Sequence, residues 1–282
     1  MRQLIYIFAL AFINSKCSGD EKVIPTSTLP TEEPVITIHP SADPDIPFTL
    51  VWEENFDGVS LNTDIWNFEL GDGCDYGICG WGNSELQRYT DSNHSLADGL
   101  LTINIEKGNF YTSTRITTKG NKEFQYGKIE SRMKLPSGDG LWPAFWMLGN
   151  DIDTNSWPAC GEIDIMEHVG RIPGIVHHSL HTTSSSGNTI NTKKVVVSNL
   201  EDDFHTYAIE WSIKAIDFYI DGDLKYTYAP GTNNPDYWPF DKPFYFLLNA
   251  AVGGNFGGEV TDENIFPQQF QIDYIKVYQR QP

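Results

Sequence analysis

Short runs with the two-residue alternation of β-strands recur throughout residues 48–281. None of the segments in this range carries a long helical stripe of apolar residues. Asp221 and Gly222, between two of the runs, are typical of a tight hairpin turn. Many short strands with turn-rich connections predict an all-β sandwich or jelly roll. The clearest predicted strands are 100–105, 127–135, 207–211, 215–220, 244–248 and 270–278.

A further short segment, 161–168, is unusually acidic. Glu162, Asp164 and Glu167 alternate there with apolar residues. A regular strand would put the first two carboxylates on one face and Glu167 on the other. A β-bulge at Ile165 and Met166 would bring all three to the same face. A helix fits less well, because Glu162 and Glu167 would lie about 140° apart around its axis. We therefore predict a bulged strand.

Three carboxylates on one face indicate either chemistry or a solvated edge. Neighbouring carboxylates raise one another's pKa, so that one can stay protonated while another is ionised. Glycoside hydrolysis needs that division, with one carboxylate attacking or activating water and one carboxylic acid protonating the leaving oxygen. The alternative is an acidic edge strand whose charges prevent aggregation.

Tryptophans near this segment favour the first interpretation. Trp142 and Trp146 share a strand face and lie about 13 Å apart at 3.3 Å per residue, more than one sugar ring. Flat aromatic rings suit the C–H faces of sugars, although two core tryptophans are an alternative. Trp157 is a candidate third platform. Pro143 predicts that the Trp142 strand is an edge strand or a bulged one.

Histidines follow in the segment 176–181, where His177 and His181 share a strand face. A zinc site there lacks the H-E-x-x-H pattern and a fixed third ligand. A hydrogen bond from a histidine to a sugar or an acid is the better interpretation, and His178 is expected to be structural.

The first 47 residues differ in composition from the rest. Residues 1–16 are interpreted as an export signal, because the apolar run 4–13 is shorter than the about 20 residues that span a bilayer. Cys17 resembles the lipidated first residue of a bacterial lipoprotein, and residues 17–47 form a predicted Pro/Thr-rich acidic spacer. We expect a surface lipoprotein of a Gram-negative outer membrane. An ordinary cleaved signal peptide and a secreted protein are the alternative. Residues 48–282 are one predicted domain.

Three further cysteines lie in that domain. Cys74 and Cys79 are in a glycine-rich loop and predict a small disulfide-closed turn in an exported protein. A metal site is less suited to this spacing, which has no second ligand pair. Cys160 is expected to be a buried free thiol.

A formal charge of −19 and a pI near 4.6 restrict the ligands. Such a protein repels nucleic acids and polyanions, including sulfated polysaccharides, so a neutral or cationic ligand is expected.

The sequence also resembles a known family. Glu162-x-Asp164-x-x-Glu167, preceded by residues 157–161, is similar to the laminarinase-like signature of glycoside hydrolase family 16. Further matching segments are 52–58, 81–87, 111–119, 142–149, 249–255 and 273–278. The resemblance implies a β-jelly roll of two curved antiparallel sheets with an open concave cleft. It also implies that Glu162 is the nucleophile, Glu167 the acid/base and Asp164 the residue that assists the nucleophile.

The resemblance implies further sites. It assigns sugar contacts to Asn83, Arg115, Trp142, Trp146, Trp157 and His181. It implies no catalytic cofactor, and a possible structural calcium at Gly99 and Asp273. Asn55 stands where the family has a glutamate in that site. Phe256 stands where many relatives have tryptophan, which would alter the acceptor side of the cleft.

We therefore predict a monomeric, endo-acting, retaining β-glucanase that acts on β-1,3-glucan, mixed-linkage β-1,3/1,4-glucan or both. A non-catalytic surface glycan-binding lipoprotein is the first alternative, which the complete set of three acids disfavours. A family 16 enzyme for agar, carrageenan or porphyran is the second, and the negative charge disfavours sulfated polymers.

Overall fold

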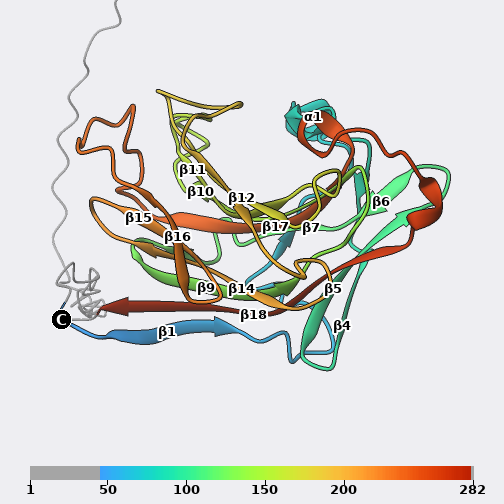
Figure 1. The fold of residues 1–282 in the computed structure, drawn as a ribbon, viewed down its shortest axis with the longest axis horizontal. Coiled ribbons are helices and arrows are strands. Elements are labelled where there is room, and N and C mark those ends of the chain that lie inside the picture. Colours follow the sequence, from blue (N-terminus) through green and yellow to red (C-terminus); the bar gives the residue numbers. More distant parts are fainter. Residues whose placement is uncertain (1–44, 281–282) are drawn as a thin grey trace, which may run out of the picture. The chain divides into compact units, whose positions relative to one another are not determined.

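The computed structural model describes residues 45–280, most of which fold into two packed β-sheets (Figure 1). The ten-stranded sheet contains β16 (Asp223–Tyr228), β15 (Ile216–Ile220), β14 (His205–Trp211), β9 (Gly127–Lys134), β18 (Gln268–Arg280), β5 (Leu100–Lys107), β6 (Tyr111–Ser113) and β3 (Arg88–Tyr89), with β1 (Phe48–Glu54) on β18 and β4 (His94–Ala97) on β5. The eight-stranded sheet contains β13 (Thr192–Val196), β12 (Ile175–His181), β11 (Glu162–His168), β10 (Leu141–Gly149), β17 (Phe244–Val252), β7 (Arg115–Thr117) and β2 (Asn67–Phe68), with β8 (Glu123–Phe124) on β17.

The strands pair antiparallel except for β3 with β6. The predicted all-β jelly roll of two antiparallel sheets is therefore confirmed. Helical segments are short: α1 (Gly254–Gly257), η1 (Cys74–Tyr76), η2 (Cys79–Gly82) and η3 (Glu263–Ile265). In Figure 1, α1 and the loops beside β10, β11 and β12 rise above the eight-stranded sheet, with α1 to the right of these loops.

The predicted export signal, the lipidation at Cys17 and all but the last residues of the spacer lie outside the described residues, so they stay predictions. Among the residues that the structure describes, no helix is long and apolar enough to cross a membrane.

The core lies between the two sheets and follows from strand alternation. Along β9, Ile129, Ser131 and Met133 are buried, while Glu130 and Arg132 between them are partly exposed. On β11, Ile163, Ile165 and Met166 are fully buried in the same cluster. Each such apolar side chain contributes about 1.5–3 kcal/mol when it leaves water. The opposite face of β11 is left for the carboxylates.

The turn between β15 and β16 contains Asp221 and Gly222, with φ of 51° and 81°. A two-residue turn with positive φ at both positions matches the twist of a hairpin. The predicted hairpin is confirmed.

The prediction that Pro143 marks an edge or bulged strand is wrong: β10 is an inner strand, and its register shift against β11 arises from the extra residue of β11. β10 lies inside its sheet, between β11 and β17, and its residues pair with β17 without a shift. The Leu141 carbonyl accepts from Gly170 on the β11 side, so by two-residue alternation the nitrogen of Pro143 faces the same side. The ladder with β11 begins only at Ala144, so the missing N–H of Pro143 interrupts no registered pair there.

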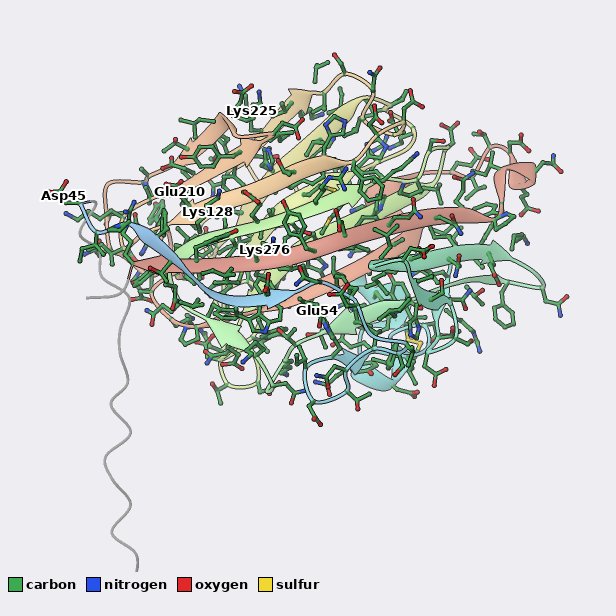
Figure 2. The ribbon with its side chains drawn as sticks, turned by 90° about the horizontal axis from the view of Figure 1, so that it is seen from below. Asp45, Glu54, Lys128, Glu210, Lys225 and Lys276 are labelled. Atoms are coloured by element: carbon green, nitrogen blue, oxygen red, sulfur yellow. A yellow bond between two sulfur atoms is a disulfide. The ribbon has the colours of Figure 1, made fainter. Side chains whose placement is uncertain are left out.

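The outer face of the ten-stranded sheet is charged (Figure 2). Lys128 pairs with Glu130 at 2.8 Å, and Lys276 lies 4.0 Å from Glu53. Exposed pairs of this kind contribute about 0–1 kcal/mol each, so the charges mainly keep this face solvated.

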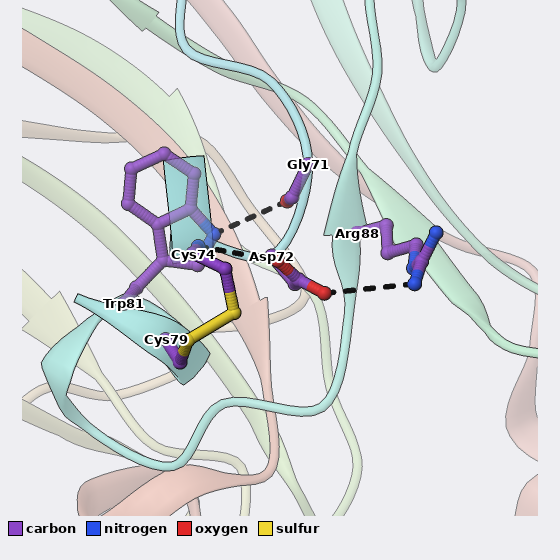
Figure 3. The surroundings of a disulfide bond; sticks show 6 residues. All are labelled: Gly71, Asp72, Cys74, Cys79, Trp81 and Arg88. Atoms are coloured by element: carbon purple, nitrogen blue, oxygen red, sulfur yellow. Dashed lines mark hydrogen bonds and ion pairs between the residues drawn. A yellow bond between two sulfur atoms is a disulfide. The ribbon is translucent and has the colours of Figure 1, made fainter. Parts of the chain in front are cut away.

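Cys74 and Cys79 form a disulfide between η1 and η2 (Figure 3). The Trp81 indole N–H beside it donates to the Gly71 carbonyl at 3.3 Å. Cys160 is a buried free thiol, as predicted. The disulfide turn directly precedes Asn83, so it anchors the segment that leads into the candidate site.

Candidate active site

A bulge in β11 brings the three acids together. Against β10, Trp146 pairs with Asp164 and Phe145 with Met166, which leaves Ile165 unmatched. Against β12, Asp164 pairs with Ser179 and Glu167 with His177, so two β11 residues oppose one residue of β12. The predicted bulge at Ile165 and Met166 is confirmed. Because of it, Glu167 faces the same side as Glu162 and Asp164.

His181 on β12 lies against the first two acids. Its Nε2 atom is 3.2 Å from Asp164 Oδ2 and 3.7 Å from Glu162 Oε1. Asp164 is 3% exposed, whereas Glu162 is only half-buried and remains accessible to a ligand. Burial raises the pKa of Asp164 well above its ordinary value; the charges of Glu162 and Glu167 raise it further, and His181 lowers it.

Glu167 is buried beside an indole donor. Trp142 donates its Nε1–H to Glu167 Oε1 at 3.1 Å. Burial and the charge of Glu162 raise the pKa of Glu167, which is about 7. His181 and the hydrogen bonds from Trp142 and Ser179 lower the pKa in part. Glu167 is thus the acid of this group that can hold a proton near neutral pH and still release it.

Two influences oppose each other on the His181 ring. Burial lowers its pKa, but the hydrogen bond to Asp164 and the surrounding carboxylates raise it, to about 10. The Gly187 N–H donates to Nδ1 at 3.1 Å, which requires a lone pair on that atom and favours the neutral ring. Both forms carry a hydrogen on Nε2, so the bond to Asp164 does not depend on which form is present.

The hydrogen bond from the Gly187 N–H to His181 also decides whether His181 and the two carboxylates beside it suit a metal ion. Glu162, Asp164 and His181 are the one set of three potential metal-binding side chains within 4.8 Å of one another in residues 45–280. Since Nδ1 accepts from Gly187, Nε2 of the neutral ring holds the hydrogen and offers no lone pair to a cation. The arrangement is suited to acid–base chemistry and not to metal binding.

The other two histidines of this segment, His177 and His178, have different surroundings. His177 is buried on the face of Glu167, and its ring makes an edge contact with Phe256 at 4.9 Å between centroids. His178 faces the core, where its Nδ1 atom lies 2.7 Å from the Ile165 carbonyl. The expected structural position of His178 is confirmed.

Trp146 lies in a wall formed by β10, β17 and β7. Its indole N–H donates to Asn249 Oδ1 at 2.8 Å. The Arg115 guanidinium is stacked 4.9 Å from the centre of the Trp146 ring and 4.4 Å from that of Trp81, and it pairs with Glu69. Arg115 is buried, and in the structure its guanidinium contacts the rings of Trp81 and Trp146. A direct sugar contact of Arg115 stays a prediction.

The other predicted sugar contacts lie around the carboxylates. Trp142 is half-buried and makes an edge contact with Phe256 of α1 at 5.3 Å. Trp157 is 43% exposed, with its ring centre 5.8 Å from that of His181. Asn83 is half-buried, and its carbonyl accepts from the N–H of Asn255 in α1. The roles of these residues toward a sugar stay predictions.

Gly99 and Asp273, the residues of the predicted calcium site, each contact other groups in the structure. Gly99 lies close to the side chain of Asp57 and the carbonyl of Asn55. The Asp273 carboxylate, however, accepts from Arg132 Nη1 at 2.6 Å, so an arginine already neutralises it. One carboxylate oxygen of the predicted donor set is therefore already paired, and bound calcium stays a prediction.

Sequence reasoning missed several residues of the site. Glu85, Ser179 and Asn249 contact predicted site residues, and Tyr89 hydrogen-bonds with Glu85 and Asn249, yet none of the four was assigned a role. Glu85 and Asn249 lie within segments that carry the family resemblance, and this was the one signal available for them. Nothing in the sequence distinguished Tyr89.

Comparisons with known proteins agree with this geometry. A family model described as "Glycosyl hydrolases family 16" matches residues 82–276. The β-glucanase of Rhodothermus marinus is 39% identical over 81% of this chain and 84% of its own length. Glucan endo-1,3-beta-glucosidase A1 of Niallia circulans is 38% identical over 87% of this chain, which spans 40% of that longer protein.

A solved structure gives the same result. The crystal structure of laminarinase from Flavobacterium sp. UMI-01 is 59% identical, with a TM-score of 0.80, over 82% of this chain and 100% of the other. The family match covers more than half of the sequence, and the β-glucanase relative is 39% identical over 84% of its own length. The chain therefore belongs to glycosyl hydrolases family 16 and is a glycoside hydrolase.

Proposed function

We propose that this glycoside hydrolase is an endo-acting, retaining β-glucanase. Its substrate would be β-1,3-glucan such as laminarin, mixed-linkage β-1,3/1,4-glucan, or both. The observation that carries the proposal is the bulged strand β11, with Glu162, Asp164 and Glu167 on one face beside Trp142 and Trp146. The names of the similar proteins, a β-glucanase, a glucan endo-1,3-beta-glucosidase and a laminarinase, support the substrate class.

The reaction would take two steps. In the first, the Glu162 carboxylate attacks the anomeric carbon while Glu167 donates its proton to the glycosidic oxygen. The bond to the leaving glucan breaks and an ester to Glu162 forms. In the second, water attacks the same carbon, Glu167 takes its proton, and Glu162 leaves as a carboxylate. Two displacements give retention, which requires carboxyl groups about 5–5.5 Å apart.

The surroundings of Glu167 suit this double role. An acid/base must be protonated before the first step and ionised after it, so a pKa near the working pH is favourable. Burial raises the pKa of Glu167 to about 7. A second negative charge on Glu162 supports the same shift, and formation of the ester would remove that charge and lower the pKa when Glu167 must act as a base.

Asp164 and His181 would hold the nucleophile in place. His181 Nε2 lies 3.2 Å from Asp164 Oδ2 and 3.7 Å from Glu162 Oε1. The backbone N–H of Gly187 fixes the other side of the ring. In this arrangement the His181 ring, held by the Gly187 N–H, would keep both Asp164 and Glu162 in position.

The direct test is Glu162→Ser. Without the nucleophile, laminarin hydrolysis should fall by at least about 10³-fold, while oligosaccharide binding by calorimetry is retained. Cleavage at a normal rate would refute the assignment. Binding by the wild type with no new reducing ends would favour the non-catalytic glycan-binding alternative.

Glu167→Ala tests the second carboxylate independently. An acid/base variant of a retaining enzyme should form a β-glycosyl azide from an activated aryl glucoside oligomer when azide is added, because the small anion needs no base. An α-glycosyl azide would indicate inversion. Product profiles on laminarin and barley glucan would separate the two linkages, and activity confined to agar, carrageenan or porphyran would contradict the substrate class.

A further inference from the structure

We propose that Glu85 is a positioning residue that fixes the Trp146 ring and the Asn83 amide in the sugar-binding wall. The inference rests on the proposed function in one respect, namely that these two groups contact the glucan. Glu85 is 9% exposed and lies between η2 and β3. It is not one of the three carboxylates on β11.

A chain of hydrogen bonds joins Glu85 to Trp146. The indole N–H of Trp146 donates to Asn249 Oδ1 at 2.8 Å, and Asn249 Nδ2 donates to the Tyr89 hydroxyl at 3.0 Å. That hydroxyl donates to Glu85 Oε2 at 3.1 Å. Tyr89 is 2% exposed and Asn249 is 5% exposed, so water does not compete freely for these groups. The chain therefore connects a buried carboxylate to an accessible aromatic platform.

The direction of this chain is set by its two ends. An indole N–H can only donate, and an ionised carboxylate can only accept. If the Asn249 amide were reversed, its NH₂ group would face the indole N–H of Trp146 and two donors would meet. If the Tyr89 hydroxyl pointed toward Asn249, Glu85 would lose a donor. One arrangement of the two middle side chains satisfies both ends, and it requires the carboxylate.

The other bonds of Glu85 extend the effect to the neighbouring segment. Asn83 Nδ2 donates to Glu85 Oε1 at 3.3 Å, and Gln87 Nε2 donates to Oε2 at 2.6 Å. Gln87 in turn accepts from the Val252 N–H at 2.7 Å, at the end of β17. One carboxylate thus accepts three donors, two of which lead to predicted sugar-binding groups.

Burial, neighbouring charges and hydrogen bonds act on the ionisation of both partners. Burial raises the pKa of Glu85, while the Arg115 charge and the three hydrogen bonds lower it. Burial and the Glu85 charge raise the pKa of Tyr89 well above its ordinary value, so its hydroxyl remains a donor. Arg115, stacked on Trp146 itself, thereby compensates the carboxylate and supports the ring.

Two variants break the chain at different points. Glu85→Gln keeps the shape but puts an amide NH₂ where only acceptors fit. Tyr89→Phe keeps the ring and removes the hydroxyl that links Asn249 to Glu85. The matched control is Tyr111→Phe, because Tyr111 donates to Glu263 at 2.8 Å, a bond of the same chemistry away from the site.

The first readout needs no substrate. In ¹⁵N-labelled protein, the indole N–H signal of Trp146 is assigned by its disappearance in Trp146→Phe. The proton signal should move upfield in both Glu85→Gln and Tyr89→Phe, since the acceptor Asn249 is no longer held, and it should stay in place in Tyr111→Phe. A merely structural role for Glu85 would leave this one signal in place in Glu85→Gln, and Tyr89→Phe shows how far it moves when the link itself is cut.

The second readout is hydrolysis of laminarin. Both variants should raise KM about tenfold and change kcat less than about threefold, as expected when a hydrogen bond that organises binding is lost. An unchanged indole signal together with an unchanged KM in Tyr89→Phe would overturn the proposal, as would a fall in kcat at constant KM. If Glu85→Gln does not fold, Tyr89→Phe still decides. If wild type cleaves no glucan, the proposed function fails while the indole signal still tests the chain.

Discussion

Trp142 and Glu167 are joined by a hydrogen bond of 3.1 Å in which the indole N–H donates to the carboxyl group. The donor lies on β10 and the acceptor on β11, and the two residues are 25 positions apart. An N–H donor stabilises the ionised form of a carboxyl group. The bond therefore limits how far burial can raise the pKa of Glu167, and it makes Trp142 part of the acid/base system as well as a candidate sugar platform.

Trp142→Phe should move the alkaline limb of the pH–rate profile upward. Loss of the indole donor removes an interaction that lowers the pKa of Glu167, which is about 7 in the wild type. One hydrogen bond to a charged group corresponds to a shift of about one pKa unit. The profile of kcat/KM from pH 5 to 9 measures it. The control is Trp157→Phe, a candidate platform with a ring contact to His181, and a limb that moves downward in Trp142→Phe would contradict the assignment.

Glu167→Gln should make the protein more stable at alkaline pH. Because the folded state raises the pKa of Glu167 from 4.5 to about 7, the protonated form favours folding. This contribution is fully present below pH 4.5 and is lost as the pH rises through 7, by at most roughly 3 kcal/mol. The glutamine variant cannot lose it, so its advantage over wild type should grow with pH.

Urea denaturation of both proteins at pH 5 and pH 8.5 measures this difference. Glu259→Gln, which neutralises an exposed carboxylate, is the control for a general change in net charge. A variant that is no more stable than wild type at pH 8.5 would show that Glu167 is ionised at little cost in the folded protein.

Local patterns allowed the central strand to be predicted, because the alternation of Glu162, Asp164 and Glu167 requires a bulge at one place if all three are to share a face. The edge prediction from Pro143 failed for a physical reason. The sequence does not show which neighbouring strand the Pro143 nitrogen faces. It also does not show that the ladder with β11 begins only after Pro143.

The Glu85 chain could not be predicted from any local pattern. It joins Tyr89 to Asn249 across 160 residues and Asn249 to Trp146 across 103 residues. Hydrogen bonds of this kind depend on which strands become neighbours. A glutamate in a turn-rich segment otherwise predicts only solvent exposure.

The bulge itself can be tested by deletion of Ile165. Because Ile165 is the unmatched residue against β10, its removal should restore a regular ladder with the same pairs on both sides. The shortened strand would read Glu162, Ile163, Asp164, Met166, Glu167, and strict alternation would keep all three carboxylates on one face. The core would lose one buried isoleucine, which costs about 2–5 kcal/mol when a cavity remains.

Deletion of Ile163 is the matched control, since it also removes one fully buried isoleucine from β11. It leaves the bulge in place and moves Glu162 to the opposite face relative to Asp164. We therefore expect the Ile165 deletion to keep measurable laminarin hydrolysis and the Ile163 deletion to abolish it, with circular dichroism confirming that each protein is folded. Equal loss of activity in two folded variants would show that the bulge does more than align the three carboxylates, because alignment alone distinguishes the two deletions.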